Sequence, residues 1–247
     1  RWHPSETPSF KDGKAECPRC GTTVDGEQVK AQGRAQDGGL PARVYAVVSQ
    51  VPVRLTYRNG EVKVRDLWRF RAPTAEDLAT LRAAEEELAR RLPEWQARGL
   101  VLDEEIPEGD KTREPRNAGF RFWRDLFLPR QLLTNLVILE EIRAAQERVR
   151  AELPADQAEA VAVYLALVFD KVISYNSAQC SWHDSRLAVR GTFMGHDFRF
   201  HAGSAEMEGV RETVMWAANQ VIDSDAALCA LIHGGEVDLA ADDEALG

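Results

Sequence analysis

The chain has 247 residues, of which 44% are hydrophobic and 29% are charged, a balance typical of a soluble globular protein. Its 31 basic and 40 acidic residues give a net charge of −9, which disfavours a uniformly nucleic-acid-binding surface because phosphate contacts need clustered cations. No run reaches the ~18 consecutive apolar residues of a membrane span, so we expect no membrane partner.

The first residues of the chain and its cysteines indicate in which compartment the protein is found. The first ten residues, RWHPSETPSF, lack the apolar region of a secretory signal. Residue 1 is Arg, so we expect a processed product or a fragment of a longer protein. Four cysteines in a chain of this length, without a secretory signal, do not predict a disulfide framework. We therefore expect a cytoplasmic protein.

The N-terminal part, residues 1–72, is predicted to be a β-rich region resembling a zinc ribbon. Val, Tyr and Leu alternate with polar residues over 42–70, a pattern typical of strands. Asn59-Gly60 predicts a two-residue hairpin turn. Pro52 predicts an edge strand or a break, because proline cannot donate to a ladder.

A helix and a polar connector are predicted over residues 73–119. Thr74 precedes Asp77 by three residues, which resembles a capping box with Asp in place of Glu or Gln. Pro93 and Gly99 are expected to bracket the end of the helix. The Pro- and Gly-rich connector that follows is the best internal boundary of the chain.

Residues 120–235 are predicted to form a mainly helical domain. Apolar residues recur at helical spacing after Pro129, and a second helix is expected over 155–178, so the two should pack as an antiparallel pair. A third helix is expected over 207–231, and 236–247 form an acidic tail. The predicted fold is therefore α+β: a small β-rich N-terminal part with a zinc-knuckle-like turn, then a mainly helical domain.

Cys17-x-x-Cys20, followed by Gly21, has the geometry of one zinc knuckle, in which two thiolates reach an ion from a tight turn. A structural zinc site needs four ligands, and Cys180-x-x-His183 has the chemistry and spacing to supply the other two. The alternative is that Cys180 ends a core helix and that His183 is a surface loop residue. A thioredoxin-like redox role needs a βαβ context, which the sequence does not offer.

A second candidate metal site consists of His196, His201 and Glu206, which recur at five-residue steps. Metal catalysis would place such ligands on one helix face. Phe198 and Phe200 alternate between them instead, which predicts a strand with the histidines on its opposite side or at its ends.

The most basic stretch of the sequence is interleaved with aromatic residues. Between Lys111 and Arg130 there are six basic and two acidic residues, a local net charge of +4. Arginine binds phosphate and aromatic rings stack on bases, so we predict a DNA-binding patch here. Its residues are Lys111, Arg113, Arg116, Arg121, Arg124 and Arg130, with Phe120, Phe122, Trp123 and Phe127 between them. The alternative is that the rings enter the core while the arginines cover them with their stems.

Several catalytic motifs are missing from the sequence. No Gly-x-Gly loop lies between a predicted strand and a helix to hold a nucleotide-type cofactor. No Pro-Pro dipeptide occurs, so there is no Asp/Asn-Pro-Pro-Tyr motif, and neither a P-loop nor a Gly-x-Ser-x-Gly elbow is present. We therefore assign no catalytic residue.

Four stretches occur in a characteristic order: AECPRCGTTVDGEQVKAQG, DLFLPRQLLTNLVILEEI, YNSAQCSW and GTFMGHDFRFHAGSAEME. Together they resemble the middle of a family of zinc-ribbon-containing, adenine-specific DNA methylases associated with anti-phage defence. The most specific parts are the Arg-Gln-Leu-Leu helix start and the Tyr-Asn-Ser helix end. The resemblance spans most of the chain.

The resemblance implies that this chain lies between a core that binds S-adenosylmethionine and a catalytic Asp-Pro-Pro-Tyr motif, with both outside residues 1–247. It implies that Cys17 and Cys20 bind zinc. In that case the other two ligands of the ribbon lie before Arg1, as an alternative to Cys180 and His183. The implied function is DNA grip or target recognition in adenine-N6 methylation, with DNA and the remainder of the methyltransferase as partners.

Two other functions stay open. The chain is alternatively a non-catalytic interaction module that docks partner proteins of an anti-phage defence complex through its helices and acidic tail. The third hypothesis is a stand-alone metal hydrolase that uses His196, His201 and Glu206.

Overall fold

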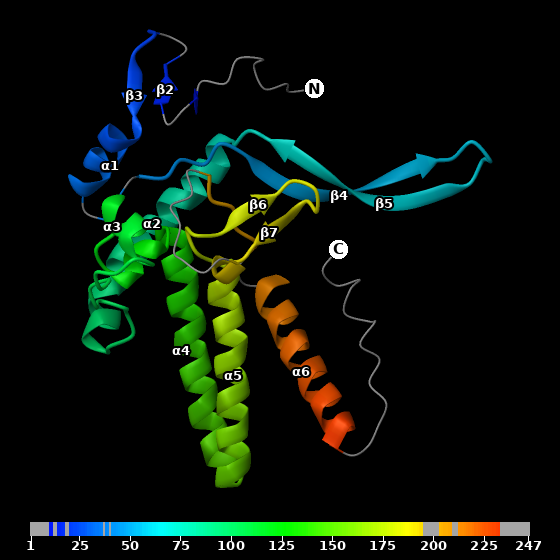
Figure 1. Cartoon of the computed structure of the whole chain (residues 1–247). Helices are drawn as coiled ribbons and strands as arrows, with labels where there is room; N and C mark the ends of the chain where they lie inside the picture. Colours follow the sequence, from blue (N-terminus) through cyan, green and yellow to red (C-terminus); the bar gives the residue numbers. More distant parts are fainter. Residues whose placement is uncertain are drawn as a thin grey trace.

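The computed structural model describes residues 10–11, 14–17, 20–36, 38–39, 41–194, 203–208 and 212–232. Within these residues, six α-helices accompany three small antiparallel sheets, which confirms the predicted α+β class. Three long helices lie side by side, and a two-stranded ribbon extends away from them (Figure 1). None of the described helices combines the length and the apolar character that crossing a membrane requires.

The N-terminal sheet is antiparallel and has the strand order β1-β2-β3. Its strands are β1 (Phe10–Lys11), β2 (Lys14–Glu16) and β3 (Thr23–Asp25). Helix α1 (Gly26–Arg34) follows at once and begins with a capping box, in which Gln28 N donates to Asp25 Oδ1 at 2.8 Å and Asp25 N donates to Gln28 Oε1 at 2.9 Å. This helix is not among those predicted from the sequence.

The ribbon consists of β4 (Val47–Thr56) and β5 (Val62–Arg71), which pair antiparallel along their whole length. Pro52 lies opposite Asp66. Because this sheet has only two strands, both are edge strands, and the predicted edge position of Pro52 is confirmed.

The turn of the ribbon differs from the prediction. Gly60 N donates to Tyr57 O at 2.9 Å, and Tyr57 N donates to Glu61 O at 2.8 Å, which makes a three-residue loop. The predicted two-residue Asn59-Gly60 turn is therefore wrong, because Gly60, at φ +81°, takes the left-handed position after a first tight turn and forms a bulge.

Helix α2 (Ala75–Ala97) begins where the sequence predicts it. Asp77 N donates to Thr74 Oγ1 at 3.2 Å, and Thr74 N donates to Asp77 Oδ2 at 2.6 Å, so the predicted capping box is confirmed. The helix ends between Pro93 and Gly99, as expected, although Pro93 itself lies inside it. The connector then forms α3 (Arg113–Asn117), and the 3-10 turn η1 (Trp123–Leu126) follows it.

Helices α4 (Pro129–Glu152) and α5 (Ala155–Tyr175) form the predicted antiparallel pair, and α6 (Glu212–Ile232) packs on the other side of α5 (Figure 1). A buried cluster joins these three helices: Ile138, Val168, Val172 and Ala217. A second cluster packs α2 and the residues after it on α4: Leu88, Trp95, Leu100, Val101 and Leu136.

A short hairpin of β6 (Ser181–His183) and β7 (Ala188–Arg190) follows α5 and leads to the 3-10 turn η2 (Thr192–Met194). The Trp182 ring meets Trp68 and Phe70 edge to face, with centroids 6.0 and 5.9 Å apart. The hairpin therefore supports the base of the ribbon.

Candidate nucleic-acid interface

The predicted DNA-binding patch, Lys111–Arg130, folds around a small apolar core of its own. Four residues are buried in that core and two more aromatic side chains pack against them: Ile106, Ala118, Phe120 and Leu126, then Trp123 and Phe127. Three of the four aromatic rings of the patch, Phe120, Trp123 and Phe127, therefore belong to the core, as the alternative interpretation of the sequence predicts. Phe122 is half-buried, as Trp123 and Phe127 are, but it does not belong to this core.

The acidic segment before the patch is folded against it. A β-bridge joins Glu105 to Phe122, and Ile106 N donates to Arg121 O at 2.9 Å. The stretch 103–130 has six basic and seven acidic residues, so its net charge is −1 where the patch alone has +4.

The five arginines of the patch each form an ion pair. The pairs are Arg113–Asp110, Arg116–Glu108 at 3.1 Å, Arg121–Glu105 at 2.5 Å, Arg124–Asp103, and Arg130–Glu206 at 2.5 Å. Lys111 is exposed and has no carboxylate partner within the described parts of the chain.

These ion pairs differ in exposure, which decides how readily a phosphate replaces the carboxylate. The Arg121 and Glu105 side chains are 68% and 56% exposed, and an exposed pair of this kind contributes only ~0–1 kcal/mol. Arg113 and Arg116 also pair with highly exposed carboxylates. Arg124 and Arg130 are largely shielded, so their pairs hold the fold together.

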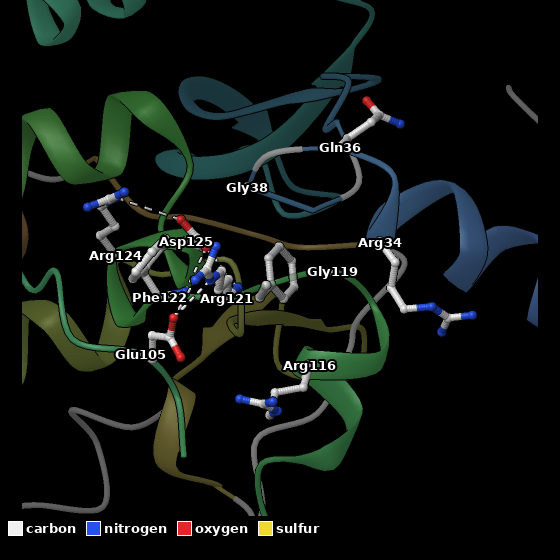
Figure 2. Close-up of a pocket in the computed structure, with 11 residues that line it drawn as sticks. Arg34, Gln36, Gly38, Glu105, Arg116, Gly119, Arg121, Phe122, Arg124 and Asp125 are labelled. Carbon is white, nitrogen blue, oxygen red and sulfur yellow. Dashed lines mark hydrogen bonds and ion pairs between the residues drawn. The ribbon is translucent and has the colours of Figure 1, made fainter. Parts of the chain in front are cut away.

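Four arginines line one open pocket of about 710 Å³ (Figure 2): Arg34, Arg116, Arg121 and Arg124. Phe122 belongs to the same pocket, and the guanidinium carbons of Arg121 and Arg124 lie 5.1 and 4.4 Å from its ring centroid. A ring flanked by planar cations suits a nucleotide, which offers both a stacking face and a phosphate.

Arg34 comes from α1 and was not expected from the sequence. Helix α1 approaches the patch closely because Gly119, at φ +97°, has no side chain: a Cβ there would lie 2.2 Å from Gly33 O. Arg34 Nη1 then donates to Asn117 O at 3.0 Å. The spacing of Asp25 and Gln28, a capping box, is the sequence signal that could have revealed this helix.

Cys17 and Cys20 lie at a tight turn between β2 and β3. Cys17 N donates to Thr22 O and Gly21 N donates to Cys17 O, both at 2.9 Å. Hydrogen bonds with Thr22, and a weaker one with Cys17, hold the pKa of the Cys20 thiol below its ordinary value. A lowered pKa favours the thiolate, the form that binds zinc.

Cys180 and His183 are not brought together with Cys17 and Cys20. Within the described residues, no three side chains of His, Cys, Asp or Glu form a group that could hold a metal ion. Cys180 is fully buried, its Sγ donates to Ser174 O at 3.3 Å, and burial raises the pKa of its thiol. That environment suits a packed thiol better than a metal ligand.

The second candidate metal site falls mostly outside the described residues, because neither His196 nor His201 is among them. Glu206 is described, and its Oε1 accepts from Arg130 Nε at 2.5 Å. The metal hydrolase hypothesis therefore stays a prediction.

Comparisons of the chain with protein-family models, with curated proteins and with solved structures each returned no match.

Proposed function

We propose that this chain is the DNA-recognition segment of an S-adenosylmethionine-dependent adenine-N6 DNA methyltransferase, with the cofactor core and the catalytic motif on polypeptide outside it. The sequence resemblance supports the enzyme class. The observation that carries DNA recognition is that four arginines line one open pocket, two of which, Arg121 and Arg124, lie over the Phe122 ring.

The pocket fits what such an enzyme needs from an accessory segment. Adenine-N6 transfer requires the target base to leave the stack, and the strand next to it must be held by its phosphates. Arg116 and Arg121 have exposed carboxylate partners that a phosphate replaces at little cost, and Phe122 offers a stacking face.

Zinc has a structural role in this proposal. Cys17 and Cys20 would supply two thiolate ligands from the turn between β2 and β3, and the Thr22 hydrogen bonds help the Cys20 thiol to lose its proton. The other two ligands would come from elsewhere in the parent protein. S-adenosylmethionine would likewise be bound only by parts of that protein outside this chain.

The test is duplex DNA binding by fluorescence anisotropy at low salt, comparing the wild type with the double variant Arg34→Gln, Arg121→Gln. Both side chains are exposed, so the variant should keep the wild-type melting temperature. The control is Arg143→Gln, Arg148→Gln, which removes the same charge from exposed positions of α4. We expect at least a fivefold weaker affinity for the pocket variant only; equal affinities for the pocket variant and the wild type would contradict the role of the pocket.

The second candidate is the interaction module, and exposed apolar residues on α5 and α6 favour it. Val163 and Leu167 on α5 are 53% and 48% exposed, and Ile222 and Leu228 on α6 are 62% and 58% exposed. Apolar surface of this kind suits a partner protein, including the remainder of the methyltransferase. Failure of the wild type to bind DNA even at low salt would favour this function.

A further inference from the structure

The β4–β5 ribbon has a charge opposite to that of the chain as a whole. Residues 47–71 contain six basic and two acidic residues, a net charge of +4 within a chain of −9. Every residue of β5 is exposed, and Figure 1 shows the ribbon extending well beyond the helices. Its cations are therefore presented to solvent at a distance from the acidic body.

The cations of β5 lie on one face of the ribbon. Successive side chains of a strand point to opposite faces, so residues separated by even numbers share a face. Four basic residues do so: Lys63, Arg65, Arg69 and Arg71. The β4 residues paired with them are all uncharged. The other face carries Arg54 and Asp66, whose charges cancel.

Fewer of these cations have ion-pair partners than those of the pocket. Arg71 is held by the first turn of α2, and Lys63 forms a highly exposed pair with Glu61 at 3.1 Å. Within the described residues, neither Arg65 nor Arg69 has an ion pair or a side-chain hydrogen bond. No carboxylate has to be displaced before these two bind an anion.

Protection of a strand edge does not explain this charge pattern. Edge strands do use charged side chains, lysine above all, to prevent pairing with other chains, but five of the six basic residues of the ribbon are arginines. The ribbon favours basic residues three to one in a chain that has more acidic than basic residues. Cations gathered on one face indicate an anionic partner.

We propose that this cationic face is a second DNA-contacting surface, which lies along the phosphate backbone of duplex DNA. Ten residue pairs span ~33 Å, close to one turn of B-DNA, and the duplex presents one negative charge per ~1.7 Å of its axis. The proposal shares with the proposed function the premise that DNA is the partner, but it concerns a different surface.

The base of the ribbon is held on both faces, so the ribbon is a supported arm. On one face Trp68 and Phe70 pack on Trp182, and on the other Arg71 pairs with Asp77. Fixing the base reduces the ordering that DNA binding would otherwise require.

The experiment measures anisotropy of a fluorescent duplex of about 20 base pairs at several salt concentrations. The ribbon variant is Arg65→Gln, Arg69→Gln, and the control is Arg143→Gln, Arg148→Gln, with equal loss of charge. Arg54→Gln tests the opposite face. Because the changed side chains are exposed and make no ion pair among the described residues, melting temperatures should not change.

We expect the ribbon variant to bind on the order of tenfold more weakly and its slope of log K against log salt to flatten by about 1.8, since each phosphate contact contributes about 0.9. The control should match the wild type, and Arg54→Gln should have the smaller effect.

Three results would overturn the proposal. If the ribbon variant binds DNA as tightly as the wild type, the ribbon proposal is wrong, but the pocket and the proposed function are unaffected. Equal weakening of DNA binding in the ribbon and control variants would show that the overall charge of the chain, and not the ribbon, decides the affinity. No binding by the wild type at low salt would remove this proposal and the proposed DNA function together.

Discussion

Arg71 of β5 and Asp77 of α2 form a two-bond ion pair, with Nη1–Oδ2 at 2.5 Å and Nη2–Oδ1 at 2.9 Å. The same carboxylate accepts from Thr74 N at 2.6 Å and from Thr74 Oγ1 at 2.8 Å, so it caps the helix and holds the ribbon at once. The Arg71 guanidinium, helped by Thr74, keeps the pKa of Asp77 well below its ordinary value.

This pair predicts a pH dependence of stability. A carboxyl whose pKa is depressed by folding stabilises the folded state above its unfolded pKa of ~3.9, and this contribution is lost as pH falls through the folded pKa. We expect Asp77→Asn to lower the melting temperature at pH 7, and the difference from the wild type to shrink steadily below pH ~4.

The control for that measurement is Asp66→Asn, which changes an exposed carboxyl without an ion-pair partner in the described chain. It should leave the melting temperature unchanged at pH 7. A difference between wild type and Asp77→Asn that stays constant between neutral and acidic pH would contradict the role of the ion pair.

The second prediction concerns two buried amides where α4 meets the end of α5. Asn176 Nδ2 donates to Asn135 Oδ1 at 2.8 Å, and Asn135 Nδ2 donates to Asn176 O at 3.2 Å. Asn176→Ala leaves the Asn135 amide oxygen buried without this donor, which should destabilise the protein by ~1–3 kcal/mol. Urea unfolding measures the loss, and Asn219→Ala on the exposed side of α6 should change stability by less than ~0.5 kcal/mol. Similar losses in both variants would refute the buried pair.

The third prediction tests how α1 reaches the pocket. Gly119→Ala adds a Cβ at φ +97° that would lie 2.2 Å from Gly33 O, so the two backbones must separate. We expect a loss of more than ~1 kcal/mol in stability and faster hydrogen exchange in α1. Gly109→Ala is the matched control, since its Cβ would meet nothing closer than 3.5 Å. Unchanged exchange in α1 would show that this contact does not hold the helix.

The fourth prediction distinguishes the cysteines by alkylation at neutral pH, followed by mass spectrometry. Cys20 is exposed and its thiol has a lowered pKa, so it should react quickly, whereas Cys180, buried with a raised pKa, should react only after unfolding. Thr22→Val should slow the reaction at Cys20. Fast labelling of Cys180 in the folded protein would contradict its buried position.

The elements with strong local signals could be predicted from the sequence. Thr74 and Asp77 define the start of α2, and Pro129 defines the start of α4, because the residues that cap or open a helix lie within one turn of its end. Helix α1 carries a signal of equal quality in Asp25 and Gln28, but it lies within residues 1–72, which are predicted to be a β-rich region.

The charge environment of the candidate interface could not be predicted in the same way. The patch has a local +4 only until the segment with Glu105 and Glu108 folds onto it, and that pairing depends on the bridge from Glu105 to Phe122. The ribbon presents the opposite case: its alternating sequence suggests a half-buried sheet, yet every residue of β5 is exposed, although Trp68 and Phe70 contact Trp182 at its base.

The central claim is that this acidic chain binds duplex DNA through local clusters of cations. The most direct measurement is the affinity of the wild-type chain for duplex DNA between about 50 and 200 mM salt. Contacts from the pocket and the ribbon together predict a straight line of log K against log salt, with a slope of about −3 to −5. Absence of binding at the lowest salt, or an affinity that does not change with salt, would contradict the claim.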